Sequence, residues 1–170
     1  MTSPPSPSPT PKPVAASRVT LSQLMQPEHA NSRGDVHGGW IMKLADEAGA
    51  LAAMRHAQAR VVTVAIDQMR FHEPIRIGDL VILEAEVTYV GRTSLETRIR
   101  VLAENPVTGE RTHTNTAYIV YVALDESGRP RPVPPLLAQS DAEVRRQKAG
   151  KARQAYRLDQ RERDREDDGE

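Results

Sequence analysis

Asp46 is the residue whose type and position most suggest chemistry. It falls in the middle of an apolar helical pattern, among Met42, Ala50 and Ala53, where the neighbouring sequence offers no cation to pair with it. Because burying an unpaired carboxylate costs free energy, such a group is retained for a purpose more often than by accident. The pattern leaves two interpretations equally open: a functional carboxylate, or an aspartate that binds a sheet residue or a subunit partner for structural reasons.

A pair of glycines precedes the same helical pattern. Loop 31–39 ends in His37-Gly38-Gly39, and two glycines at the start of a helix let the backbone approach a ligand closely. Their N–H groups lack partners within the helix and lie at the positive end of its dipole, where they can bind a phosphate or an oxyanion. An ordinary helix N-cap also uses glycine, and it is the commoner interpretation of an isolated pair.

A second polar segment, Gly91-Arg92-Thr93-Ser94, joins two predicted strands. It offers backbone N–H groups, two hydroxyls and a guanidinium that can bind phosphate, although a lone segment of this kind is more often only a turn.

Metal and nucleotide chemistry have less support. The chain has no cysteine, no phosphate-binding glycine motif and no Gly-x-Ser-x-Gly motif. No metal site is expected, because metal-ligand spacing is also missing among the histidines, which are His29, His37, His56, His72 and His113.

Composition places the chain among single-domain proteins, since 170 residues are too few for two comfortable domains. The 23 Lys and Arg residues equal the 23 Asp and Glu residues, so the chain lacks the overall excess of positive charge expected of a nucleic-acid-binding protein. No apolar run approaches the roughly 20 residues that span a bilayer. We therefore expect a soluble, intracellular protein that binds no nucleic acid and inserts into no membrane.

The chain divides into three parts by composition. Residues 1–16 are rich in Pro, Ser and Thr, and we expect a disordered tail with nothing to bury. Residues 17–138 carry the folded domain. Residues 139–170 are almost entirely polar and are expected to form an exposed helix with charge pairs, whose thin alanine stripe is too weakly apolar to anchor it. A partner-binding helix is the less favoured alternative there.

The elements that must position these residues are one helix and five strands. Segment 37–57 is apolar on nearly two-thirds of its circumference, which predicts a helix buried on most sides. Segment 61–71 is apolar at both odd and even positions, as in a strand buried on both faces. Short connections favour antiparallel neighbours. The fold class is therefore α+β, a long buried helix wrapped by an antiparallel sheet of about five strands, at 19–25, 61–71, 80–90, 94–103 and 112–124.

The order of these motifs resembles the hotdog-fold acyl-CoA thioesterases. The segments that carry the resemblance are HGGWIMKLADEAGALAA, VVTVAIDQMRFHEPIRIGDLV and VGRTSLETRIRV, within about residues 17–137. The branch concerned contains the YciA-type and the cytosolic acyl-CoA hydrolase-type enzymes. In that family a long central helix is wrapped by an antiparallel sheet, which agrees with the fold predicted from periodicity. Many members of the branch have Phe-Gly-Gly where this chain has His37-Gly38-Gly39, so the subgroup and the acyl chain stay open.

The resemblance also implies roles for particular residues. It implies that Asp46 is the catalytic aspartate, that Asn31 is the catalytic asparagine, and that Thr63 orients Asp46. It implies that the N–H groups of Gly38 and Gly39 bind the thioester carbonyl. Coenzyme A would contact a group of residues made up of His37, Gly91, Arg92, Thr93 and Ser94.

The activity implied is hydrolysis of acyl-CoA to a carboxylic acid and coenzyme A, without a cofactor, in the cytoplasm. Asp46 would act as general base or as nucleophile, and the sequence does not choose between them. Because the Asp and Asn of one site come from different subunits in this family, the resemblance implies a homodimer, further assembled into a hexamer. Two alternatives are less favoured: an acyl dehydratase using His37 and Glu47, because Glu47 falls on the outer stripe beside Lys43, and a non-catalytic acyl-CoA sensor, which has no need of a buried base. An adaptor that works through its charged C-terminal helix is compatible with the enzyme.

Overall fold

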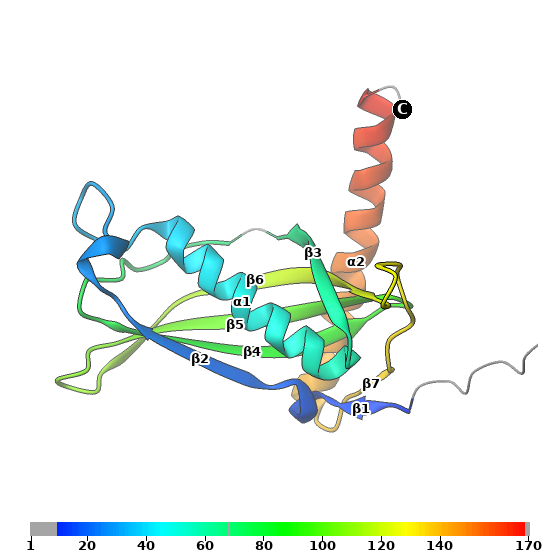
Figure 1. Ribbon diagram of the computed structural model, residues 1–170, viewed down its shortest axis with the longest axis horizontal. Helices are drawn as coiled ribbons and strands as arrows, with labels where there is room; N and C mark the ends of the chain where they lie inside the picture. The colour runs from blue at the N-terminus through cyan, green and yellow to red at the C-terminus, as the bar shows by residue number, and fades with distance from the viewer. Residues whose placement is uncertain (1–9, 68, 169–170) are drawn as a thin grey trace, which may run out of the picture.

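The computed structural model describes residues 10–67 and 69–168. A long helix lies against one face of a curved sheet, and a second long helix lies on the opposite face (Figure 1). In chain order the elements are β1 (Lys12–Pro13), η1 (Val14–Ser17), β2 (Val19–Leu24), η2 (Pro27–His29), α1 (Gly38–Ala57), β3 (Arg60–Ile66), β4 (Leu80–Val90), β5 (Ser94–Glu104), β6 (Arg111–Leu124), β7 (Leu136–Leu137) and α2 (Asp141–Asp168), where η marks a 3-10 helix.

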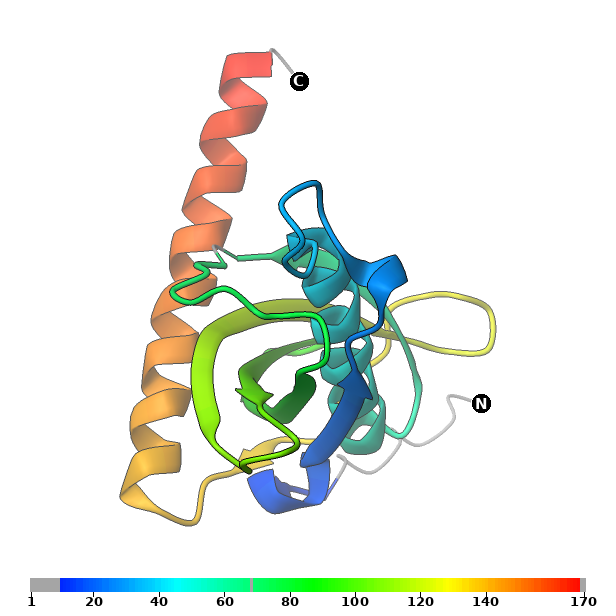
Figure 2. The same cartoon turned by 90° about the vertical axis from the view of Figure 1, so that its left-hand side faces the viewer.

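Five of the strands form one antiparallel sheet in the order β2-β4-β5-β6-β3. The sheet curls around α1, as the end-on view shows (Figure 2), so the predicted fold class is confirmed. One detail of the prediction is wrong, because β3 pairs with β6 rather than with β4. The strand ends at Ile66 instead of residue 71, which leaves segment 67–79 long enough to carry the chain across the sheet to β4, next to the opposite edge strand β2.

Strand β3 is an edge strand of this sheet, with β6 as its neighbour. The prediction that it is buried on both faces is wrong for a single chain: Val62, Val64 and Ile66 are 43%, 54% and 43% exposed. An exposed apolar edge strand offers unpaired backbone groups to another chain. The apolar pattern that suggested double burial therefore marks a surface that one protomer leaves uncovered.

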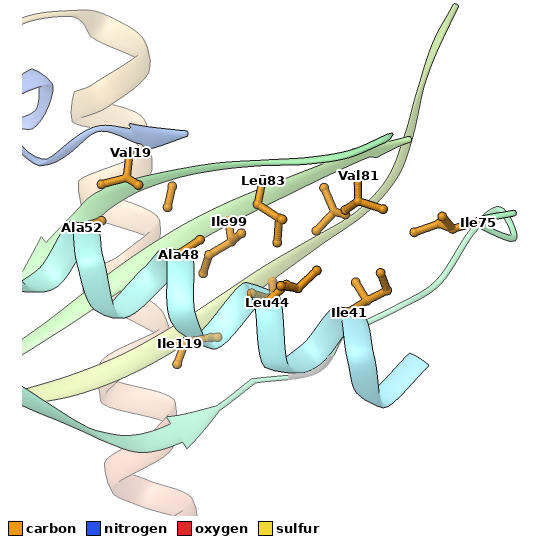
Figure 3. Packing of buried hydrophobic residues seen from close by; sticks show 14 of the residues in the cluster. Val19, Ile41, Leu44, Ala48, Ala52, Ile75, Val81, Leu83, Ile99 and Ile119 are labelled. Atoms are coloured by element: carbon orange, nitrogen blue, oxygen red, sulfur yellow. The ribbon is translucent and has the colours of Figure 1, made fainter. Parts of the chain in front are cut away.

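The core lies between α1 and the inner face of the sheet. Ile41, Leu44 and Ala48 point from the helix toward the strands, where Leu83 and Ile99 meet them (Figure 3). The predicted burial of the helix is correct for this face only. Two residues expected to be covered, Met42 and Leu51, are 40% and 41% exposed in the single chain, because no described element packs over them.

The N-terminal boundary of the domain lies earlier than residue 17. Residues 1–9 of the expected tail are outside the described residues, but segment 12–17 packs against the domain. Val14 is only 3% exposed, and Ser17 Oγ accepts a hydrogen bond from the N–H of Val87 at 2.9 Å. Lys12 Nζ donates to the carbonyl oxygen of His56 at 2.9 Å. The expectation of a tail without buried residues is therefore wrong from Lys12 onward. Composition could not predict this, because the attachment depends on the contacts of a single valine and a single serine.

Helix α2 runs along the outer face of the sheet and projects beyond it (Figures 1 and 2). The helix was predicted, but not its attachment, which is electrostatic rather than apolar. Glu96 on β5 is 1% exposed and accepts hydrogen bonds from Arg153 at 2.7 and 3.0 Å and from Arg157 at 3.0 Å. Arg157 also binds Asp67, just beyond β3, at 2.6 Å. The Arg153 guanidinium stacks over the ring of Tyr118 on β6. Two arginines thus connect β5, β6 and the end of β3.

Candidate active site

Asp46 lies on the side of α1 that faces β3 and is half-buried, less than its apolar neighbours suggested. The Thr63 hydroxyl donates to Asp46 Oδ1 at 2.8 Å. The Tyr121 hydroxyl lies 3.2 Å from the same oxygen and 2.9 Å from the backbone oxygen of Asp46. Both donors are neutral, and Oδ2 accepts no hydrogen bond from any residue that the structure describes. Within the described residues, one carboxylate oxygen is held and the other is left free.

The two donors converge because they face each other across a strand pair. Thr63 and Tyr121 are direct partners in the β3–β6 ladder. The register shifts between Thr63 and Ala65, and such a bulge re-aims side chains at the edge of a sheet. The predicted contact between Thr63 and Asp46 is present. Tyr121 was missed, and its only signal was a hydroxyl on an apolar strand, which normally needs a partner when it is buried.

Tyr121 is a neutral hydrogen-bond donor over the whole working range of the protein. Burial raises the pKa of Tyr121 far above its usual value, and the negative charge of Asp46 and the hydrogen bond to it raise this pKa further, while a hydrogen bond with Thr97 opposes the shift. A phenol with such a pKa keeps its proton near neutral pH. It can therefore donate to Asp46 but cannot act as a base.

Asn31 lies beyond the N-terminal end of α1 and is not brought to Asp46 within the chain. Its Oδ1 accepts hydrogen bonds from the N–H groups of Arg33 at 2.9 Å and Asp35 at 3.3 Å. The tight loop relies on Gly34, whose φ of +87° favours glycine. Asn31 and Gly38 line a hollow of about 400 Å³. Along the helix, Gly38 and Asp46 are separated by about 12 Å at 1.5 Å per residue.

The start of α1 is capped by His37. Its Nδ1 accepts the Gly39 N–H at 2.9 Å, and its carbonyl oxygen accepts the Trp40 N–H at 2.9 Å. The expectation that the N–H groups of both glycines are free for a ligand is therefore wrong for Gly39, because the neighbouring histidine satisfies that donor. Gly38 has a different constraint: an added Cβ would lie 3.4 Å from the Phe71 ring.

Turn 91–94 lies at the other end of the sheet from Asn31. The Asn31 loop adjoins the beginning of β4, where the Met25 N–H donates to Asp79 O, whereas the turn follows the end of β4. Eleven strand residues separate these ends by roughly 35 Å. The turn is closed by a hydrogen bond from the Gly91 N–H to Ser94 O at 2.8 Å, and the Arg92 side chain is exposed. The predicted site residues thus lie in three places, which are the Asn31 loop, the Asp46 cluster and this turn.

The structure gives less support to the other functions considered from the sequence. Glu47, the acid of the dehydratase hypothesis, is exposed and pairs with Lys43 at 2.6 Å on the outer side of α1. Within residues 10–67 and 69–168, no three His, Asp or Glu side chains cluster as metal ligands would. Neither α1 nor α2 has the length and apolar character that crossing a membrane would require.

Known proteins are similar to this chain in sequence. A family model described as the Thioesterase superfamily matches residues 33–110. The acyl-CoA thioester hydrolase YciA of Salmonella typhimurium is 38% identical over 120 residues, which cover 68% of this chain and 90% of that protein. The chain belongs to the thioesterase superfamily. It spans only 39% of the length of the cytosolic acyl coenzyme A thioester hydrolases of mouse and rat, to which it is 34% identical over 147 residues.

Solved structures of this superfamily agree with the hotdog fold expected from the resemblance. An apo-hexameric acyl-CoA thioesterase superposes with a TM-score of 0.85 at 40% identity, over 89% of this chain and 97% of its own. An acyl-CoA hydrolase from Staphylococcus aureus, solved with butyryl coenzyme A and coenzyme A, gives 0.85 at 28% identity, over 91% and 94%. Other structures of that enzyme carry alanine in place of an asparagine, an aspartate or a threonine. The intervals between those three positions are the same as the intervals between Asn31, Asp46 and Thr63.

Proposed function

We propose that this protein hydrolyses acyl-CoA thioesters to a carboxylic acid and coenzyme A. The observation that carries the proposal is the Asp46 carboxylate, which Thr63 holds by one oxygen while the other accepts no hydrogen bond from the described residues. The matching intervals between the three residues substituted in the Staphylococcus aureus acyl-CoA hydrolase support roles for Asn31, Asp46 and Thr63. A sensor that only binds acyl-CoA would have no use for a carboxylate held in this way.

In the proposed reaction Asp46 uses its second oxygen, Oδ2, in one of two ways. As general base, it removes a proton from the water that attacks the thioester carbonyl carbon. As nucleophile, it attacks that carbon itself to give a mixed anhydride, which water then hydrolyses. In both cases coenzyme A leaves as a thiolate that takes up a proton. No cofactor or metal enters either route in this proposal. The Gly38 N–H is the remaining candidate donor to the carbonyl oxygen.

We propose that the complete site forms between two copies of the chain. Asn31 precedes the start of α1 at Gly38, which lies about 12 Å along the helix from Asp46, and the apolar edge strand β3 is open. Pairing of two β3 edges would cover this strand and bring a second chain close to the Asp46 cluster. Hexameric thioesterases among the solved structures favour further assembly into a hexamer.

Turn 91–94 is the proposed contact for coenzyme A, together with His37. Arg92 is exposed and can bind a phosphate group, as the sequence suggested. The proposal includes a cytoplasmic location, which the name of the mammalian cytosolic relatives supports, and a role in fatty acid metabolism.

The decisive experiment measures coenzyme A thiol release from a series of acyl-CoA chain lengths. Asp46→Asn keeps the size of the side chain and removes its charge, and we expect kcat to fall about 10²–10⁴-fold if Asp46 is a general base, and further if it is the nucleophile. We also expect an unchanged or higher Tm, because active-site charges are often held at a cost in stability. Glu47→Gln is the matched control, since it removes an exposed carboxylate from the adjacent position. Near wild-type kcat in Asp46→Asn would contradict the proposal.

A further inference from the structure

Tyr121 is the largest fully buried side chain of the described chain, and its hydroxyl is placed at Asp46. It lies on the inner face of β6, where its cross-strand partner is Thr63. Its hydroxyl oxygen is 2.9 Å from the backbone oxygen of Asp46 and 3.2 Å from Oδ1. The single phenol proton is therefore shared between the backbone oxygen and the side-chain oxygen Oδ1 of the same residue.

The helix leaves room for this hydroxyl at Gly49. A Cβ added at Gly49 would lie 2.5 Å from the Tyr121 hydroxyl oxygen and 2.8 Å from Thr97 Oγ1. Real side chains do not approach so closely, so any larger residue at this position would displace the phenol or the helix. A mid-helix glycine costs about 1 kcal/mol of helix stability relative to alanine, and here it admits a hydroxyl to the Asp46 turn.

We propose that Tyr121 is a positioning residue for thioester hydrolysis. Together with Thr63 it fixes Asp46 Oδ1, and this leaves Oδ2 as the oxygen that takes the proton of the attacking water or bonds to the carbonyl carbon. This inference rests on the proposed function. Tyr121 itself touches neither substrate nor water in the reaction, because it is completely buried behind the carboxylate.

The physical basis is restriction of a carboxylate that has no cation beside it among the described residues. A carboxylate on a helix can rotate about its side-chain bonds, and a single hydrogen bond restricts this rotation only weakly. Two donors from neighbouring strands reach the same oxygen from different positions, so rotation would break at least one hydrogen bond. Misplacement of a reacting group by about 1 Å can cost 10²-fold in rate. We therefore expect loss of the phenol hydroxyl to lower kcat far more than it alters binding.

The first test is Tyr121→Phe, which keeps the ring and removes the hydroxyl. We expect kcat for acyl-CoA hydrolysis to fall about 10- to 100-fold while KM changes less than about twofold. Tyr118→Phe is the matched control, because it makes the same change on the same strand but on the outer face, under Arg153. We expect its kcat to stay within about twofold of wild type. Wild-type kcat in Tyr121→Phe would overturn the proposal.

A second test separates positioning from a general effect on the fold. In an Asp46→Asn background there is no carboxylate to orient, so adding Tyr121→Phe should change the residual rate less than about twofold. The same loss in both backgrounds would overturn the positioning role, since a purely structural residue lowers both rates alike. If Tyr121→Phe does not fold, Gly49→Ala replaces it, because the new methyl group displaces the phenol while the hydroxyl is retained. Wild-type kcat in folded Gly49→Ala would then overturn the proposal.

The two proposals fail in different ways. If the wild-type protein releases no coenzyme A from any acyl-CoA, the proposed function fails, and the role of Tyr121 fails with it. If the wild type hydrolyses acyl-CoA and Asp46→Asn does not, while Tyr121→Phe matches the wild type, only the role of Tyr121 fails.

Discussion

At the scale of single residues, Asp46 is held by neutral donors. These are a threonine and a tyrosine, whose hydroxyls remain uncharged at neutral pH. A lysine or arginine in their place would pair with the carboxylate and compete with a proton or a carbonyl carbon for it. Neutral donors orient the group and leave its charge available. This arrangement explains why an aspartate without a local cation can stand in an apolar helix.

Arg92 belongs to the same scale, and its substitution should affect binding rather than chemistry. Its carbonyl oxygen accepts the Val133 N–H at 3.0 Å, so the backbone should survive removal of the side chain. Because coenzyme A carries several phosphate charges, we expect Arg92→Ala to raise KM several-fold with little change in kcat. Arg129→Ala, in the exposed loop after β6, should change neither value. A fall in kcat at constant KM would instead place the turn at the reacting carbonyl.

How far the sequence predicts the site depends on which contacts are local. Asp46 is conspicuous from helical periodicity, and Thr63 and Asn31 follow from the resemblance. Tyr121 does not, because its partnership with Thr63 depends on the pairing of β3 with β6, and the short connections favoured a different neighbour for β3. The hydrogen bond from Gly39 to His37 was also hidden, since either a ligand or the histidine can accept that N–H.

At the scale of elements, α2 is bound through a buried carboxylate. Burial pushes the pKa of Glu96 up, but the hydrogen bond and charge of Arg153, with Thr88 and Arg157, outweigh burial and leave this pKa below its usual value. The sequence predicted the helix and its charges but not this anchor. Periodicity measures apolar faces, whereas the anchor joins residues that are far apart in the chain through charge.

The lowered pKa of Glu96 fixes the sign of a pH effect on stability. A carboxyl group whose pKa is lower in the folded than in the unfolded protein stabilises the fold. This contribution is fully present above the unfolded pKa of about 4.3, and it is lost as the pH falls through the lower folded pKa. We expect the Tm of the wild type to fall in that acid range, and we expect the Tm of Glu96→Gln to depend less on pH. Glu96→Gln should also lower stability at pH 7 by about 3 kcal/mol, because it takes the carboxylate partner from the partly buried Arg153, although Arg157 keeps Asp67. Glu110→Gln, on an exposed loop, is the control. Equal acid dependence in wild type and Glu96→Gln would contradict this account.

The N-terminal segment makes a second prediction for the elements. Removal of residues 1–9 leaves in place the contacts that Val14 and Ser17 make with other described residues, so Tm should stay within about 1 °C. Removal of residues 1–17 exposes the apolar surface under Val14 and leaves the Val87 N–H without its partner. A loss of about 2–4 kcal/mol should lower Tm by roughly 4–16 °C. Equal Tm values for the two deletions, measured by circular dichroism, would show that segment 12–17 contributes nothing.

At the scale of the whole molecule, the candidate site residues of one chain lie in three separate places. The Asn31 loop and turn 91–94 lie at opposite ends of β4, and Asp46 lies beside β3. The surface around Asp46 is also the apolar one, since exposed Val62, Val64 and Ile66 follow the same edge. Both facts have one economical explanation. A second chain along β3 would cover the apolar edge and supply the missing groups in one step.

Substitution of Val64 tests this explanation. Val64 is 54% exposed on β3, and a lysine there would place a charge inside the proposed apolar contact between chains. By light scattering, we expect the wild type to have at least twice the mass of one chain, and Val64→Lys to approach the mass of a single chain. The variant should lose most of its hydrolysis although Asp46, Thr63 and Tyr121 are unchanged. Val107→Lys, at a position 92% exposed in the loop between β5 and β6, should keep wild-type mass and activity. A wild type that is active as a stable monomer would contradict both the shared site and the edge contact.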